Sequence, residues 1–215
     1  MFRTRKIGFA LLAAAVVALA VLIAYRTYAS YQSRSQQREI AARVAEATAQ
    51  LRQGLTAGPT PDGVKGIEAA LAALRAASLS RQRALADAAD DYMAGARAIL
   101  LRRVDVARAA RQAAAARQAV IVQLSTPRGR DDGWIRQAAV LKKRADEAQF
   151  ELNVAADTVI ELLSKLPESE AKLAAQLGSG MLLEEDLRRA ALNGARDEAS
   201  RAASELEKLR RLPGR

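Results

Sequence analysis

Apolar residues recur along most of the chain at alternating intervals of three and four, which is the spacing of one face of an α-helix. The most regular row runs through residues 134–166 and lasts for more than four heptads. Its members are Trp134, Ala138, Leu141, Ala145, Ala148, Leu152, Ala155, Val159, Leu162 and Leu166. A row this narrow is typical of a coiled-coil seam, because a globular surface helix carries a wider apolar stripe.

A second long helix is predicted over about residues 80–124 with the same spacing. Its row consists of Leu85, Ala89, Tyr92, Ala96, Ile99, Val106, Ala110, Ala113, Val120 and Leu124. Arg103 and Arg117 fill two further positions, where they either reach out from the seam edge or fix its register through buried pairs. Residues 125–133 (STPRGRDDG) break the helix, so 80–124 and 134–166 are predicted to fold as an antiparallel hairpin.

Shorter signals delimit the remaining helices. Asp131 or Asp132 can cap the second hairpin helix, and Pro167 is predicted to end it. Thr60 followed by Pro61 is a suitable N-cap and first position for another helix. A last helix is predicted over about residues 182–211, with acidic residues in its first turn and basic residues in its last.

Two buried faces are expected before the hairpin. They consist of Ile40, Val44, Ala47 and Leu51 in one helix, and of Ile67, Leu71 and Leu74 in the next. A break is expected near residues 78–80, because an unbroken helix from residue 60 to 124 would be ~97 Å long and would run back into the membrane.

Residues 7–25 (IGFALLAAAVVALAVLIAY) contain no charge over 19 positions. As a helix they span ~28 Å, close to the thickness of the bilayer core. The alternative is a cleaved signal peptide, but the run is longer than the ~7–15 apolar residues usual there, and no clear Ala-x-Ala site follows it. We therefore predict a single transmembrane anchor that is retained.

Composition supports the helical prediction, because half the residues are apolar and only 4% are aromatic, with Ala the best helix former prominent among them. The predicted fold class is all-α: one N-terminal transmembrane helix followed by an Ala-rich coiled coil or antiparallel helical bundle. The predicted order is a short basic cytoplasmic tail (1–6), the anchor (7–25), a stalk helix (26–58) and the bundle domain (60–215).

The charges that flank the anchor predict its orientation. Arg3, Arg5 and Lys6 precede it, whereas Arg26 alone follows it closely, although Arg34 lies only a little further on. The excess of basic residues marks the cytoplasmic side. We expect a single-pass membrane protein with a cytoplasmic N-terminus and a translocated domain, which is periplasmic if the source is a Gram-negative bacterium.

Charge is segregated within the hairpin. Residues 102–144 hold 11 basic and 3 acidic side chains, a net charge of +8, and residues 145–186 hold 2 basic and 10 acidic ones, a net charge of −8. Folding the hairpin about Gly129 brings opposite charges together. The pairs predicted are Arg102 with Asp157, Arg108 with Glu151, and Arg111 with Glu147.

The charges do not balance at the end of the hairpin. The candidate partner-binding residues there are Arg117, Arg128, Arg130, Trp134, Arg136, Lys142, Lys143 and Arg144. Such a cluster attracts an anionic partner, such as an acidic protein surface or a polyanion. The alternative is a solvated basic end that binds nothing. Nucleic acid is an unfavourable partner, since no aromatic residues are interleaved for base stacking.

The sequence argues against an enzyme. It contains neither His nor Cys, the commonest general base and the usual thiolate ligand or nucleophile. Asp87, Asp90 and Asp91 share one turn, but a solvated helix face explains them without a metal. We predict no catalytic residues, no metal site and no cofactor.

The functional prediction is accordingly a structural one: a membrane-anchored coiled-coil scaffold or docking protein of the cell envelope. Its partners would be the bilayer through residues 7–25 and another protein or a second copy through the coiled coil. The alternative is a helical-bundle sensor or ligand-binding module. With six residues before the anchor, such a module would have to act through an associated membrane protein. Whether the long helices pair within one chain or between chains is left open by the sequence.

Overall fold

The computed structural model describes residues 2–77, 79–125 and 131–211, and the side chains of 16–77, 79–125 and 131–209. This part of the chain is helical, apart from short connections, and forms the predicted all-α helical bundle. Its α-helices are α1 (Phe2–Thr56), α2 (Pro61–Ala76), α3 (Arg83–Ser125), α4 (Asp132–Leu177) and α5 (Glu185–Arg211). Two 3-10 turns, η1 (Ser80–Gln82) and η2 (Ser179–Met181), precede α3 and α5.

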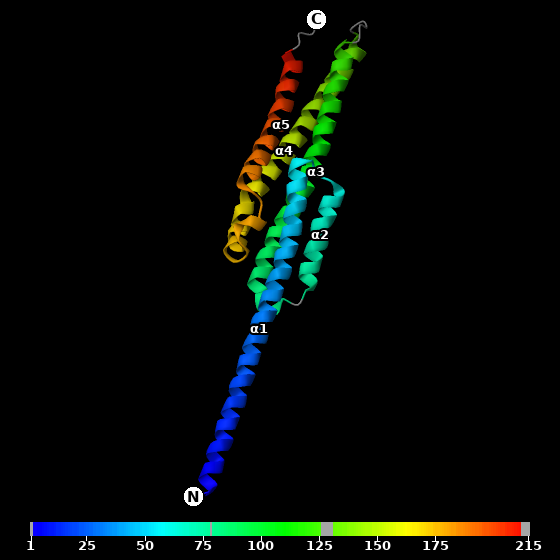
Figure 1. The fold of residues 1–215 in the computed structure, drawn as a ribbon. Helices are drawn as coiled ribbons and strands as arrows, with labels where there is room; N and C mark the ends of the chain where they lie inside the picture. The colour runs from blue at the N-terminus through cyan, green and yellow to red at the C-terminus, as the bar shows by residue number, and fades with distance from the viewer. Residues whose placement is uncertain (1, 78, 126–130, 212–215) are drawn as a thin grey trace.

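The α3–α4 hairpin runs the length of the bundle and organises the other helices (Figure 1). The helices α1 and α2 pack along the lower half of α3, and α5 packs along the upper half of the hairpin (Figure 1). The N-terminal part of α1 extends beyond the bundle, whereas the end of α3, the start of α4 and the end of α5 lie at the opposite end (Figure 1).

Local sequence sets the helix boundaries as predicted at three points. The Thr60 hydroxyl accepts a hydrogen bond of 3.1 Å from the Gly63 amide and begins α2, with Pro61 in its first turn. The Asp131 carboxylate accepts one of 2.7 Å from the Trp134 amide and begins α4. The chain also breaks between α2 and α3, at the predicted position.

The second half of α1 packs in the core of the bundle, although residues 26–58 were predicted to form a stalk. Ile40, Val44, Ala47 and Leu51 are fully buried, so the face predicted from their spacing is part of the core. The bundle therefore includes the second half of the predicted stalk, residues 40–56, rather than beginning at residue 60. A helix end at Thr56 is favoured by Gly58, whose φ of +97° is accessible to glycine without strain.

The prediction that Pro167 ends a helix at residue 166 is wrong, because α4 continues to Leu177. Proline removes one backbone hydrogen bond and crowds the preceding turn. Burial on both sides compensates for this loss, since Leu163, Leu166 and Leu173 are each no more than 3% exposed. The proline is thus held within a helix that the core anchors on either side of it.

The apolar stripe of α4 is wider than the predicted coiled-coil seam. The buried residues of α4 are Ala145, Gln149, Leu152, Ala156, Val159, Leu163, Leu166, Glu170 and Leu173. The predicted positions Ala148, Ala155 and Leu162 are only partly buried beside this row. A broader stripe is expected for a helix with two neighbours, and α4 packs against both α3 and α5.

No helix within the described part of the chain is both long enough and apolar enough to cross a membrane. Residues 7–15 of the predicted anchor lie outside the residues whose side chains are described.

Candidate functional site

The candidate site is the end of the bundle opposite the N-terminus, which we call the tip. It comprises the last turns of α3, the first turns of α4 and the last turns of α5 (Figure 1). A groove of about 270 Å³ runs between these three helices. It is lined by Val120, Gln123, Leu124, Trp134, Ile135, Ala138, Ala139, Lys142 and Leu209. The groove is therefore mostly apolar, with a cation at its margin.

Trp134 and Ile135 give the groove its accessible apolar surface. The backbone amide of Trp134 donates to the Asp131 cap, which places this residue in the first turn of α4. Trp134 is half-buried, whereas Ile135 is 54% exposed. A large apolar side chain that remains exposed beside a groove is a typical feature of a docking surface. Trp134 was among the candidate partner-binding residues predicted from the sequence, whereas Ile135 was not.

Four cations lie on the first turns of α4, and one of them, Lys142, lines the groove. Arg136, Lys142, Lys143 and Arg144 are all exposed, as a binding tip requires. Lys143 lies 3.7 Å from Glu147, but both side chains are well exposed, so this pair holds the lysine only weakly. Arg136, Lys142 and Arg144 form no ion pair with any described residue. The predicted members Arg128 and Arg130 lie outside the described residues.

Arg117 does not belong to the accessible tip, which corrects the sequence prediction. Its side chain is 13% exposed and pairs with Glu205 of α5 at 3.1 Å. Nη1 also donates, over 3.5 Å, to the Gln149 side chain and to the Ala202 carbonyl. Arg117 therefore joins α3 to α4 and α5, which agrees with a buried role in fixing register and leaves no charge for a ligand.

The charge pairs predicted across the hairpin do not form. Arg102 pairs with Asp105 of its own helix at 3.0 Å, and Arg111 donates to the Ala107 carbonyl. Arg108 and Glu151 make no ion pair with described residues, although both line one groove.

That second groove, of about 450 Å³, lies on the α3–α4 hairpin, and we call it the back groove. It is lined by Arg102, Asp105, Arg108, Ala109, Gln112, Phe150, Glu151, Val154, Ala155 and Thr158. All of these belong to α3 or α4. The register predicted for the hairpin is thus close to the observed one, while the predicted ion pairs are absent.

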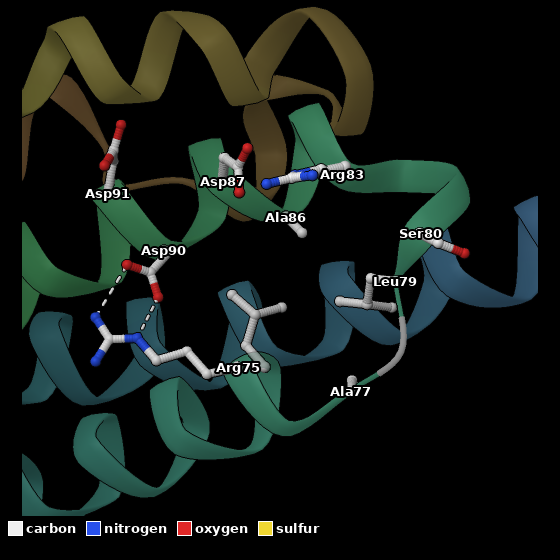
Figure 2. Close-up of a pocket in the computed structure, with 10 residues that line it drawn as sticks. Arg75, Ala77, Leu79, Ser80, Arg83, Ala86, Asp87, Asp90 and Asp91 are labelled. Atoms are coloured by element: carbon white, nitrogen blue, oxygen red, sulfur yellow. Dashed lines mark hydrogen bonds and ion pairs between the residues drawn. The ribbon is translucent and has the colours of Figure 1, made fainter.

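A larger cleft, of about 560 Å³, lies where α2 turns into α3 (Figure 2). Figure 2 shows Arg75 of α2 reaching Asp90 of α3 through two nitrogens, with hydrogen bonds of 2.6 and 3.0 Å. This contact raises the pKa of the Arg75 guanidinium. Asp91 points away from the pair and lies 3.9 Å from Lys172. Asp90 and Asp91 therefore pair with residues of other helices, whereas the sequence predicted a solvated helix face for the aspartates.

Among the described residues, no group of three or more carboxylates is arranged to hold a metal ion.

The most strongly buried titratable groups occupy a separate junction where α5 meets the rest of the bundle. The Tyr92 hydroxyl and the Thr48 hydroxyl share a hydrogen bond of 2.9 Å, and burial raises the pKa of Tyr92 to about 12. Glu170 of α4 accepts a hydrogen bond of 2.6 Å from Arg188 of α5. Burial raises the pKa of Glu170 even though Arg188 opposes the shift. This junction stabilises the helix packing and opens into none of the three grooves described above.

The fold and its surfaces define the chain as an all-α helical bundle with a cationic, partly apolar tip. No protein-family model, curated protein or solved structure matches the sequence.

Proposed function

We propose that the chain is a membrane-anchored docking protein of the cell envelope, which holds a partner protein at its tip. The proposal is supported mainly by the positions of two exposed apolar surfaces. One is the N-terminal part of α1 and the other is the groove at the tip, and they lie at opposite ends of an elongated bundle (Figure 1). An elongated body with an adhesive surface at each end is suited to connecting two objects.

The first object is proposed to be the bilayer, in contact with residues 7–25. Val17, Leu19 and Val21 of this stretch are 60–62% exposed, so the bundle does not bury them. A helix that is apolar on all sides requires an apolar environment. The stretch contains no charge and has bilayer length, and α1 continues from it without interruption into the core at Ile40.

The charge bias around residues 7–25 supports a cytoplasmic N-terminus. The bundle would then lie on the translocated side, which is the periplasm in a Gram-negative cell. In this orientation the tip is the most membrane-distant part of the chain, so it is positioned to meet another envelope component rather than the lipid of its own membrane.

The second object is proposed to be an acidic, partly apolar segment of another protein. Trp134 and Ile135 supply apolar contact area in the groove. Lys142 at its margin, with Arg136 and Arg144 on the same helix, supplies positive charge that no described residue pairs with. Charge complementarity of this kind mainly increases the association rate and the specificity, whereas the buried aromatic and aliphatic anchors supply most of the affinity.

Crosslinking in native membranes tests this function. A photoreactive amino acid at position 139, which lines the tip groove, should capture a discrete envelope protein. Replacing Lys142 and Lys143 by Glu reverses two charges beside the groove and should reduce the yield at least tenfold, which corresponds to about 1.4 kcal/mol.

The matched control replaces Arg81 and Arg83 by Glu. These two exposed cations lie at the other end of the hairpin, so the crosslink should be retained. An equal loss of crosslink in both double variants, or no discrete product in the unmodified chain, would contradict docking at the tip.

A further inference from the structure

The exposed apolar side chains of the bundle are concentrated on the upper part of the hairpin. Leaving aside α1 and Met181, the described large apolar residues that remain exposed are Leu101, Ile121, Val122, Ile135, Val140, Phe150 and Val154. Phe150 is the most exposed of these, at 68%. Ile135 belongs to the tip groove, but Phe150 and Val154 line the back groove, which is a different surface.

Three of these residues lie at heptad spacing from residues of the back groove. On α3, Leu101 and Val122 are seven and fourteen positions from Arg108, and on α4 Val140 is fourteen positions from Val154. Residues spaced by seven share one side of a packed helix, apart from a drift of about 20° per heptad. Because Arg108 and Val154 line the back groove, this spacing places Leu101, Val122 and Val140 on the same sides of the two helices, beyond the groove itself.

The two walls of the back groove carry exposed charges of opposite sign. Arg108 on the α3 wall and Glu151 on the α4 wall are exposed, and neither forms an ion pair with a described residue. A two-fold axis that runs along the groove would set each α3 above the α4 of the other copy at the same level. Arg108 of each copy would then meet Glu151 of the other, and Val122 would meet Val140.

We infer that two copies of this chain associate through the back groove, as a parallel four-helix layer made of both α3–α4 hairpins. The occupant of the groove is thus a second copy. Its self-complementary charge favours this occupant over a partner of uniform charge, because such a partner would match only one wall.

The available area is sufficient for a specific dimer. From Leu101 to Val122 the face is ~33 Å long, and two adjacent helices are ~20 Å wide, giving roughly 650 Å² per copy. For two copies the total is roughly 1,300 Å², which lies at the lower end of the about 1,200–2,000 Å² that specific interfaces bury. Phe150 is also exposed, and phenylalanine is one of the residue types enriched in the cores of protein interfaces.

The arrangement also agrees with the proposed function, on which this one point rests. A two-fold axis parallel to the helices leaves every helix direction unchanged, so both N-termini point the same way. Two copies anchored in one membrane require this orientation. The groove and its charges are independent of the anchor.

The test uses the full chain in detergent, with the protein mass measured by light scattering after size-exclusion chromatography. The unmodified chain should have twice the mass of one chain at micromolar concentration. Arg108→Glu and Glu151→Arg each place like charges in contact across the axis, so each variant alone should elute with the mass of one chain. Phe150→Asp should do the same, because it places a charge at the centre of the interface.

Mixing the two charge variants provides the decisive comparison. A chain with Arg108→Glu faces a chain with Glu151→Arg through two attractive pairs, so the mixture should recover the doubled mass. Only contact between chains can produce this recovery, and it also demonstrates that both variants are folded. Arg201→Glu, an exposed change on α5, is the control and should remain dimeric.

A single-chain mass for the unmodified protein, unchanged dimers in the charge variants, or no recovery on mixing would each overturn the inference. Because the measurement is made in detergent and without a tip partner, none of these results bears on anchoring or docking.

Discussion

At the scale of single residues, buried polar groups are concentrated where α5 joins the bundle. Glu170 is 8% exposed and Gln149 is 6% exposed, and both lie on α4. Arg188 of α5 binds Glu170, while the Gln149 amide donates to the Ala199 carbonyl of α5 over 3.4 Å. Small alanines on α5 permit many registers of similar energy, so these polar contacts select one of them.

The Glu170–Arg188 pair yields a prediction about pH. Burial raises the folded-state pKa of Glu170 above its ordinary 4.5, so the carboxyl favours folding when protonated. That contribution is complete below the ordinary value and is lost as pH rises through the raised folded value. In Arg188→Met the carboxylate loses its charged partner, and the free energy of unfolding should fall by about 3 kcal/mol near pH 7.

Near pH 4 the deficit of Arg188→Met should be much smaller, because Glu170 is then largely protonated. Urea unfolding followed by circular dichroism at both pH values measures the difference. Arg189→Met is the control, since Arg189 is 69% exposed and its pair with Glu185 should contribute less than about 1 kcal/mol. A deficit that is equal at both pH values would show that packing, rather than charge, explains the effect.

At the scale of elements, the sequence predicted every long helix but not all of the helix boundaries. Periodicity located the buried faces of α1 and α2, and Thr60 and Asp131 identified two N-caps. The C-terminal end of α4 was predicted wrongly, because the expectation that proline ends a helix considers only the backbone next to the proline. The helix continues past Pro167 because residues on both sides of it, such as Leu173, are buried in the core.

The candidate site was only partly predictable for a similar reason. Exposed cations on the first turns of α4 follow from the sequence, and Lys142 and Lys143 are found at the tip. The burial of Arg117 depends on Glu205, which lies 88 positions away along the chain, and no local spacing predicts that contact. The back groove likewise results from the placement of α5 on the other side of the hairpin.

Close helix packing in the lower half of the bundle gives a prediction at the scale of elements. A Cβ atom at Gly54 of α1 would collide with the side chain of Leu100, which is fully buried in α3. Gly54→Val should therefore lower the free energy of unfolding by about 1–3 kcal/mol through overpacking. Gly194→Val on α5 enters open space and should change it by no more than about 0.5 kcal/mol in urea unfolding.

If Gly54→Val and Gly194→Val had equal effects, close approach of α1 to α3 would not be the reason for the glycine.

At the scale of the whole molecule, the chain separates three surfaces along one axis. Residues 7–25 lie at one end, the cationic tip lies at the other, and the back groove lies between them on the hairpin (Figure 1). In the proposed function the first contacts lipid and the second contacts a partner protein, while the third joins two copies. Helices that run continuously from one surface to the next keep these positions fixed relative to one another.

The central claim is that α1 is embedded in a bilayer before it enters the bundle, and cysteine accessibility tests it most directly. The chain has no cysteine, so Leu19→Cys and Ser35→Cys each introduce a single thiol. Both positions are exposed in the structure, so the protein itself does not shield either thiol. In native membranes a membrane-impermeant maleimide should label Ser35→Cys from the translocated side and leave Leu19→Cys unlabelled until detergent is added. Equally fast labelling of both thiols in intact membranes would contradict the account.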